Sequence, residues 1–530
     1  MKLRLFVLRP NRIMLALLAA ALTAALPARA DVRLPRVFSD NMMLQRDMPV
    51  HVWGWAEPGE AVSAALAGSD ASTKADVHGE WSLELPALKD GENLELLVSG
   101  KNSLTLKNII VGDIWVCSGQ SNMEMTLGGC LGAAEDIQGA ELPKIRRIRV
   151  EKVQSGQPES DLPTPNQWQV CSPQTAGGFT AVGFYFAREI QQQTGVPIGI
   201  IDSNWGGSRI EPWTTPQGVA MIPELKADSD GIAAAGKAYR DGLLTKLGSL
   251  ERWIVRTRAE LDKGEPVSPA PGMPVPPVRG WSGMYNAMIH PLAKFPIKGA
   301  LWYQGESNGG EGQTYYNKMH ALVGGWRKAW GQGDFPFHWV QLANFQNPIE
   351  DPAGGNGWAK LREAQTLALD LPHSGMAVIT DTVPLTEAGD IHPKNKYDVG
   401  YRLARWSLGQ DYGKTEHAYS GPLFKAIEIA GGKARVEFEH TGAGLMIGKK
   451  EGRNPAVEDA EGKLKRFAVA GADQKWHWAD AVIENNAVVV SSPEVPEPVA
   501  VRYAFEMNPD GANLYNKDGL PAGPFRSDDW

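Results

Sequence analysis

The sequence predicts an α/β protein whose parallel sheet lies in a central domain flanked by two all-β modules. Between residues 109 and 418, short apolar runs typical of strands buried on both faces alternate with helical patterns. Before residue 109 and after residue 418, apolar and polar side chains alternate between turn signals, as in half-buried strands.

The central domain is predicted over residues 109–418, with strands and helices in alternation. Helices are expected between the strands, for example over 359–369 and 396–408. Strands are predicted at 109–117, 196–201, 297–303, 338–342 and 376–380.

The flanking modules are predicted over residues 31–108 and 419–530, and both read as β structure. In the first, Trp81, Leu83 and Leu85 fall on one face of a strand, and residues 50–55 form another strand candidate. The second module has alternation over 434–439 and an apolar run at 488–490. Short strands between turns favour sandwich-like modules.

An insertion is predicted at about 222–278 of the central domain. Residues 222–262 have leucines and isoleucines at helical spacing, and six prolines follow between 266 and 277. A substrate lid and a flap without a role are both open interpretations.

The first 30 residues resemble a cleaved secretory signal peptide. A basic segment, about 14 apolar residues and a small-residue cleavage site follow one another, and a membrane span needs ~20 apolar residues. We therefore expect a periplasmic or secreted protein that begins at about Asp31 and does not stay in the membrane.

Charge and cysteine content exclude several function classes. The net charge of −8 gives no electrostatic reason to bind nucleic acid or anionic lipid. Three cysteines without a Cys-x-x-Cys motif favour neither zinc nor redox chemistry, and no cofactor is expected. Cys130 and Cys171 either form a disulfide or, with Cys117, stay as buried thiols.

The motif SGQSNME at 118–124 directly follows the predicted strand at 109–117. The carboxyl ends of parallel strands are where open α/β sheets build their sites. Gly119 permits a tight turn that exposes the Ser121 hydroxyl, and the Ser121 N–H can face an oxyanion. Met123 replaces the second glycine of Gly-x-Ser-x-Gly, which argues against an α/β-hydrolase elbow.

A base for Ser121 is predicted in the motif GDIHP at 389–393, where His392 precedes a proline and a helix. The acid that orients His392 is Asp390 in the favoured interpretation. Asp381, at the end of the strand at 376–380, is its rival, and Glu306 is a third option.

Two further loops, 203–209 and 304–308, follow predicted strands and bring glycines and amides to the same edge. They suit oxyanion donors.

The motifs GQSNM (119–123), NWGG (204–207), WYQGESN (302–308) and DIHP (390–393), in this order, resemble the sialate O-acetylesterase-like branch of the SGNH hydrolases. The resemblance covers nearly the whole mature chain. It implies a flavodoxin-like three-layer α/β/α domain, without metal or cofactor, that removes acetyl groups from sugars. It also implies Ser121 as nucleophile, His392 as base, and an oxyanion hole formed by the Ser121 N–H, Gly206 or Gly207, and a side-chain amide. For that amide Gln304 is favoured over Asn308. Gly389 stands where the general Asp-x-x-His pattern has its acid.

The predicted activity is therefore an exported serine esterase for acetylated sugars or glycans, most similar to a sialate 9-O-acetylesterase. Arg209 is a candidate cation for the sialate carboxylate, and Trp205 and Glu306 complete the predicted substrate-binding set. An acetylesterase for xylan or xyloglucan is the alternative, and a carbohydrate-binding protein without catalysis is a remote one. The sequence does not predict the oligomeric state.

Overall fold

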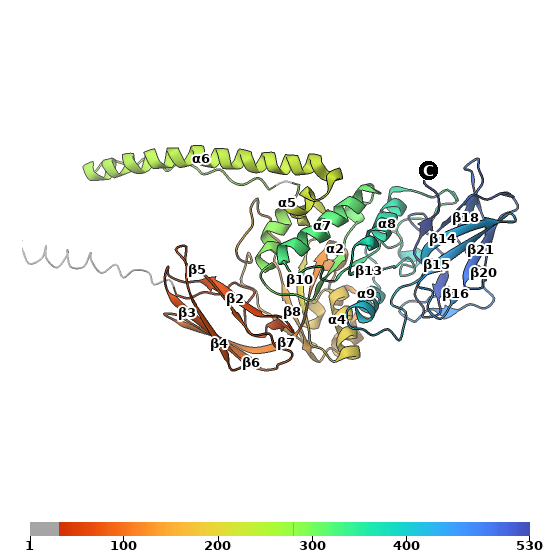
Figure 1. The fold of residues 1–530 in the computed structure, drawn as a ribbon, viewed down its shortest axis with the longest axis horizontal. Coiled ribbons are helices and arrows are strands. Elements are labelled where there is room, and N and C mark those ends of the chain that lie inside the picture. Colours follow the sequence, from red (N-terminus) through yellow and green to blue (C-terminus); the bar gives the residue numbers. More distant parts are fainter. Residues whose placement is uncertain (1–30, 279) are drawn as a thin grey trace, which may run out of the picture. The chain divides into compact units, whose positions relative to one another are not determined.

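The computed structural model describes residues 31–278 and 280–530, so the predicted signal peptide lies outside the described residues. The chain divides into two compact units (Figure 1). The smaller contains residues 31–34 with Val52–Leu85 and Leu96–Thr105, and the larger contains Pro35–His51, Pro86–Glu95 and Leu106–Trp530. The domain boundaries at 108/109 and 418/419 stay predictions.

The smaller unit is built from short strands, as expected. Buried and exposed side chains alternate along the strand at 80–85, with Trp81, Leu83 and Leu85 inside, which confirms the predicted face. The strands form a two-stranded pair, β2 (Val50–Trp55) with β5 (Glu80–Leu85), and an antiparallel set, β4 (Ser69–Lys74), β3 (Ala61–Leu66) and β6 (Leu94–Ser99).

The larger unit is organised around a sheet in the order β13-β12-β11-β7-β10-β8-β9, in which every pair is parallel except β8–β9. All five predicted strands are confirmed; β7 begins at Ser103, six residues before the predicted start, and the bounds of the other four agree within three residues. The bounds are β1 (Met43–Gln45, parallel to β7), β7 (Ser103–Gly119), β8 (Leu142–Arg149), β9 (Gln169–Cys171), β10 (Ile198–Asn204), β11 (Gly299–Tyr303), β12 (Phe337–Val340) and β13 (Ser374–Ala377).

The strand β8 escaped prediction because it carries four basic residues instead of an apolar run. One of them, Arg147, is buried and pairs with Asp202 on the neighbouring β10 (2.7 Å). A buried charge is tolerated in a sheet when it is paired in this way.

Helices cover both faces of this sheet and make a three-layer α/β/α domain (Figure 1). Tyr303 of β11 packs in one core with α4 and α9. Trp302 points to the opposite face, where its ring meets Trp213 and Trp326 edge to face. The helices are α3 (Ala133–Gln138), α4 (Ala181–Thr194), α5 (Pro216–Ala220), α7 (Thr314–Trp330), α8 (Gly357–Leu367) and α9 (Lys396–Gln410).

The predicted helical insertion is a single helix, α6 (Lys226–Lys263), of 38 residues. Most of its residues are exposed, and the following proline-rich segment lies against it through a bond from Trp253 Nε1 to the Ser268 carbonyl (2.7 Å). Among the helices of the described chain, α6 included, none has the length and apolar character of a membrane span.

The C-terminal part is all-β, and the strands predicted at 434–439 and 488–490 are confirmed as β15 and β21. Val436, Val488 and Val501 share one apolar core. Its strands are β14 (Leu423–Ala430), β15 (Lys433–Glu439), β16 (Leu445–Lys449), β17 (Val457–Glu458), β18 (Phe467–Ala470), β19 (Trp476–Trp478), β20 (Asp480–Glu484), β21 (Ala487–Ser491), β22 (Ala500–Tyr503), β23 (Leu514–Asn516) and β24 (Phe525–Arg526).

The cysteines are all unbonded in this structure. Cys117 and Cys171 are buried and Cys130 is half-buried, so the disulfide considered from the sequence is not formed. Burial raises the pKa of Cys130 to about 11 and that of Cys171 to about 12, which keeps both as neutral thiols.

Candidate active site

Three neighbouring strands end at the same level and bring their loops together. Gly119 at the end of β7 lies opposite Asn204 of β10 on one side and Tyr303 of β11 on the other. Gly119 has φ +135°, and a Cβ there would lie 2.1 Å from the Tyr303 carbonyl oxygen. Only glycine fits such a close approach, and it lets the chain turn sharply into Gln120 and Ser121.

Ser121 opens the one-turn helix α2 (Ser121–Glu124) and faces His392 across the strand ends. Its Oγ lies 2.8 Å from His392 Nε2. Because the other ring nitrogen faces a carboxylate, which only accepts, Nδ1 carries the proton and Nε2 accepts from the Ser121 hydroxyl. The pair has the geometry of a nucleophile and its base.

Asp390 is the acid that reaches His392. Its Oδ1 lies 3.2 Å from His392 Nδ1 and also accepts the His392 backbone N–H at 2.9 Å. That backbone bond and the Lys394 ammonium, 3.2 Å from Oδ2, hold the pKa of Asp390 below its ordinary value. Asp390 is therefore ionised at neutral pH.

The rival acid, Asp381, is engaged elsewhere. Its carboxylate is buried and binds the Arg402 guanidinium through two bonds of 2.6 and 2.8 Å, and Tyr515 donates to it at 3.0 Å. Burial opposes ionisation, but Arg402 outweighs it and the pKa of Asp381 lies below its ordinary value. Asp381 is a structural ion-pair partner in this geometry.

The backbone N–H groups expected at the oxyanion hole differ in availability. Gly206 lies against Ser121, but its N–H donates to Glu124 Oε2 at 2.7 Å. The N–H groups of Ser121 and Gly207 have no acceptor within the described parts of the chain. These two are the donors that remain for an oxyanion.

The two amides considered as side-chain donors are both occupied. Gln304 is fully buried, and its Nε2 donates to Gln120 Oε1 (3.1 Å), Ser208 O (3.2 Å) and Asn308 Oδ1 (2.9 Å). Asn308 directs its Nδ2 toward Glu211 at 3.3 Å. In this structure neither amide has an N–H left for an oxyanion, because the neighbouring loops use them all.

We therefore expect Gln304→Ala to act mainly on stability. It removes four internal bonds, three from Nε2 and one that Tyr315 donates to Oε1 (2.8 Å), and leaves a cavity, which costs about 2–5 kcal/mol. Turnover of the protein that stays folded should change little. Urea unfolding and kcat measured on the same preparation test this, and a 10²–10³-fold loss of kcat at unchanged stability would restore Gln304 as an oxyanion donor.

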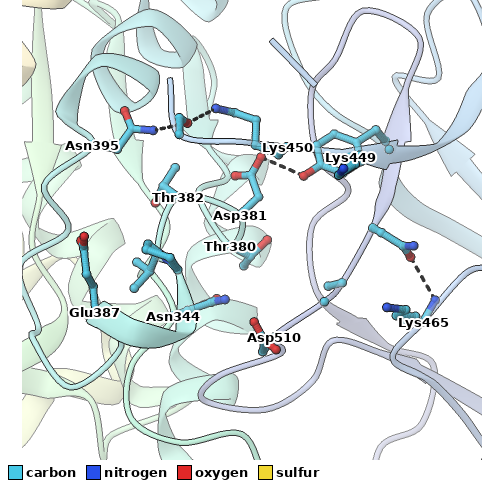
Figure 2. A pocket seen from close by; sticks show the side chains of 18 of the residues that line it. Asn344, Thr380, Asp381, Thr382, Glu387, Asn395, Lys449, Lys450, Lys465 and Asp510 are labelled. Atoms are coloured by element: carbon cyan, nitrogen blue, oxygen red, sulfur yellow. Dashed lines mark hydrogen bonds between the residues drawn. The ribbon is translucent and has the colours of Figure 1, made fainter. Parts of the chain in front are cut away.

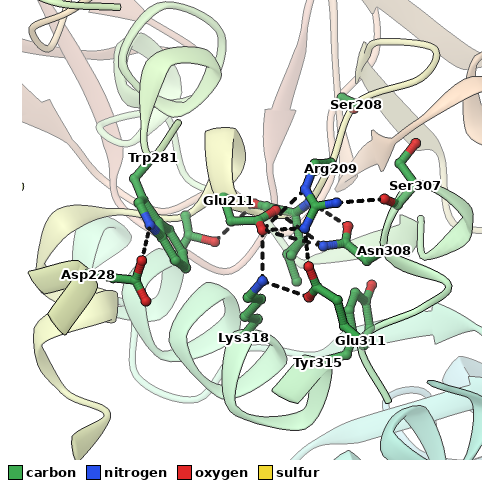
Figure 3. A network of polar contacts seen from close by, with 12 residues as sticks. Ser208, Arg209, Glu211, Asp228, Trp281, Ser307, Asn308, Glu311, Tyr315 and Lys318 are labelled. Atoms are coloured by element: carbon green, nitrogen blue, oxygen red, sulfur yellow. Dashed lines mark hydrogen bonds and ion pairs between the residues drawn. The ribbon is translucent and has the colours of Figure 1, made fainter. Parts of the chain in front are cut away.

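Arg209, the expected cation for a substrate carboxylate, sits in a polar network instead (Figure 3). Its guanidinium binds Glu211 (2.9 Å) and Glu311, and both carboxylates also bind the buried Lys318. Trp205 is half-buried, and its backbone N–H donates to the Gly119 carbonyl at 3.0 Å, which holds the loop in place. Arg209 thus has its charge balanced before any substrate arrives.

Comparison with known proteins shows the family to which the chain belongs. Residues 111–233 and 277–408 match the family described as "Carbohydrate esterase, sialic acid-specific acetylesterase". A carbohydrate acetylesterase from Xanthomonas citri is 37% identical in its solved structure, with a TM-score of 0.78, and the match covers 94% of this chain and 100% of that one. The chain belongs to this family of carbohydrate esterases.

More distant relatives are named sialate O-acetylesterases. The sialate O-acetylesterase of Homo sapiens is 27% identical over 97% of this chain and 96% of its own length. That of Mus musculus is 28% identical over 74% and 76%. The chain is accordingly a carboxylic ester hydrolase that acts on carbohydrate.

Three residues of this site were not predicted from the sequence. Asn122 and Glu124 lie in the serine motif at 118–124, and Lys396 lies in the helix that follows the His392 loop. Glu124 orients the Gly206 loop, and Asn122 binds the carbonyl of Ile391 next to His392 (3.0 Å). Lys396, the first residue of α9, reaches Asn122 from the other side. Asn122 and Glu124 could have been found from the sequence because they lie beside Ser121. The buried Lys396, at the start of a helix, could not have been found in this way.

A polar pocket of about 570 Å³ lies next to the loop that carries Asp390 (Figure 2). It is lined by residues after β13, such as Thr382 and Glu387, and by C-terminal residues such as Lys449 and Asp510. Lys394, which binds Asp390, is part of its wall. Within the ranges 31–278 and 280–530, no three His, Cys, Asp or Glu side chains are grouped to hold a metal ion.

Proposed function

We propose that this esterase removes O-acetyl groups from carbohydrate by acyl transfer through Ser121. The observation that carries the proposal is the Ser121–His392–Asp390 line of contacts, with distances of 2.8 and 3.2 Å, at the carboxyl edge of the sheet. Ser121 Oγ attacks the acetyl carbonyl carbon while His392 Nε2 takes its proton. Asp390 stabilises the imidazolium that forms.

The oxyanion of the tetrahedral intermediate is received by the Ser121 and Gly207 N–H groups. His392 then returns the proton to the sugar oxygen as the C–O bond breaks, which leaves an acetyl group on Ser121. Water attacks this ester with His392 again as base, and acetate leaves.

We propose a neutral acetylated polysaccharide, such as xylan or xyloglucan, as the substrate. A sialate needs a cation for its carboxylate, whereas Arg209, Lys152 and Lys394 are each paired with a carboxylate of the protein. The side chains of His392 and Asp390 are 34% and 45% exposed, so a polymer can reach them without entering a closed cavity.

Sialate is the second candidate, favoured by the name of relatives that match over nearly the whole chain. Acetate release from acetylated xylan, acetylated xyloglucan and 9-O-acetyl sialate, compared as kcat/KM, separates the two. The polysaccharides should be better substrates by at least about tenfold, which corresponds to 1.4 kcal/mol in the barrier. A preference for the sialate by that factor would reverse the assignment.

Export through the segment at 1–30 is also proposed, because a wall polysaccharide lies outside the cell. N-terminal sequencing of the protein recovered from the periplasm or medium should begin at about Asp31. Protein that remains in the cytoplasm with residues 1–30 attached would contradict export.

A further inference from the structure

A buried polar cluster lies behind the Ser121–His392 pair. It consists of Asn122 of α2, Glu306 of η7 (Glu306–Asn308), and Lys396, which opens α9. Asn122 and Lys396 are 1% and 0% exposed. Three separate elements therefore meet beneath the site through side chains that no step of acyl transfer touches.

Asn122 uses both amide hydrogens and its side-chain oxygen in this cluster. Its Nδ2 donates to Glu306 Oε1 and to the Ile391 carbonyl (3.0 Å), and its Oδ1 accepts from Lys396 Nζ. The Ile391 carbonyl can only accept, so the orientation of the amide is determined by its partners. The turn that carries Ser121 is thereby bound to the residue before His392.

The cluster is costly to bury. Lys396 Nζ lies 5.3 Å from the centroid of the Tyr303 ring, and Glu306 Oε2 has no hydrogen-bond partner among the described residues. Burial lowers the pKa of Lys396 to about 7 and raises that of Glu306. Apolar side chains of similar volume would be as stable or more stable here, so stability does not account for the cluster.

We propose that Lys396, Asn122 and Glu306 are positioning residues that fix the His392 loop relative to Ser121. The inference rests on the proposed roles of Ser121 and His392. The loop then has two anchors: Asp390 holds His392 from within the loop, and Asn122 holds Ile391 from the nucleophile's turn. A displacement of about 1 Å between nucleophile and base is enough to lower turnover by roughly 10²-fold.

The test replaces Lys396 by methionine, which keeps most of the length of the side chain and removes its charge. We expect kcat to fall roughly 10–100-fold with KM within threefold of wild type, measured at a temperature at which both proteins are folded. Asn122→Asp, nearly isosteric, loses both donors and should lower kcat at least as much. Ser407→Ala, which removes a buried hydroxyl further along α9, is the matched control and should keep kcat within twofold.

The role of the cluster is separated from general structural damage by the His392→Ala background. A residue that acts through His392 has nothing left to position there, so Lys396→Met should change the residual rate by less than about twofold. A further 10–100-fold loss in that background would overturn the positioning role. The positioning role would also be overturned if Lys396→Met and Asn122→Asp both kept kcat within twofold of wild type while Ser121→Ala was inactive. An active Ser121→Ala protein would instead overturn the proposed function.

A pH readout checks that the lysine is buried as described. The groups facing Lys396 are Glu306 of η7, Tyr303 of β11, Cys130, and Asp390 and Lys394 of the His392 loop. Between pH 7 and the ordinary lysine value of 10.5, the unfolded chain binds a proton that the folded chain does not. Stability therefore rises with pH across this window in the wild type, and Lys396→Met should lack this contribution. Equal pH slopes in urea unfolding would contradict the burial.

Discussion

Replacing Ser121 by alanine should lower the rate of acetate release by about 10⁶-fold while the protein stays folded. The expected loss is this large because Ser121 Oγ forms the covalent bond to the acetyl group. Without it, the site can contribute only substrate binding and oxyanion stabilisation. The Ser121 side chain bonds to His392 at the rim of the site, so its loss should not disturb the core. Acetate release by wild type and variant on one acetylated glycan measures the effect.

The unfolding midpoint of Ser121→Ala serves as its control, and His392→Ala should be nearly as inactive because the two residues act as one unit. A folded Ser121→Ala protein that keeps more than a few per cent of the activity would remove Ser121 from the mechanism.

Asp390→Asn should reduce kcat by up to ~10⁴-fold with little effect on folding or substrate binding. An amide that donates toward His392 Nδ1 favours the wrong tautomer, and the imidazolium loses its counter-charge. Because Asp390 is half exposed, its replacement leaves no buried group without a partner. The measurement is kcat at a fixed pH, with KM as the check on binding.

Asp381→Asn is the matched comparison and should behave in the opposite way. Removing the carboxylate leaves Arg402 buried with its charge uncompensated, which costs about 3–5 kcal/mol. The folded fraction should turn over at nearly the wild-type rate. If Asp381→Asn is inactive while folded and Asp390→Asn is near wild type, the acid is Asp381; if neither matters, Ser121 and His392 act as a dyad.

Much of the fold was predictable because its strands can be recognised from their local sequence alone. The runs at 109–117 and 297–303 are nearly continuous in apolar residues, as expected for a strand buried on both faces of a parallel sheet. The strand β8 was missed because its arginines are neutralised by residues distant in sequence, such as Asp202. Whether a charge is paired is a property of the packed fold and not of the strand that carries it.

The same limit applies to the site. The positions of Ser121, His392 and Asp390 followed from motifs at strand ends, whose meeting is dictated by parallel register. The states of Gln304 and Arg209 did not follow, because they depend on partners such as Gln120 and Glu311 and on the direction in which each side chain points. A motif places an amide near a strand end but does not tell which of its N–H groups is already used.

The most direct test of the central claim is to trap the acetyl-enzyme. Wild-type protein is mixed with excess acetylated glycan, quenched in acid within the first turnovers, digested and analysed by mass spectrometry. We expect one acetyl group on the peptide that contains Ser121, and none in Ser121→Ala. Acetate released at the full rate with no acetyl group on Ser121 at any time would contradict it.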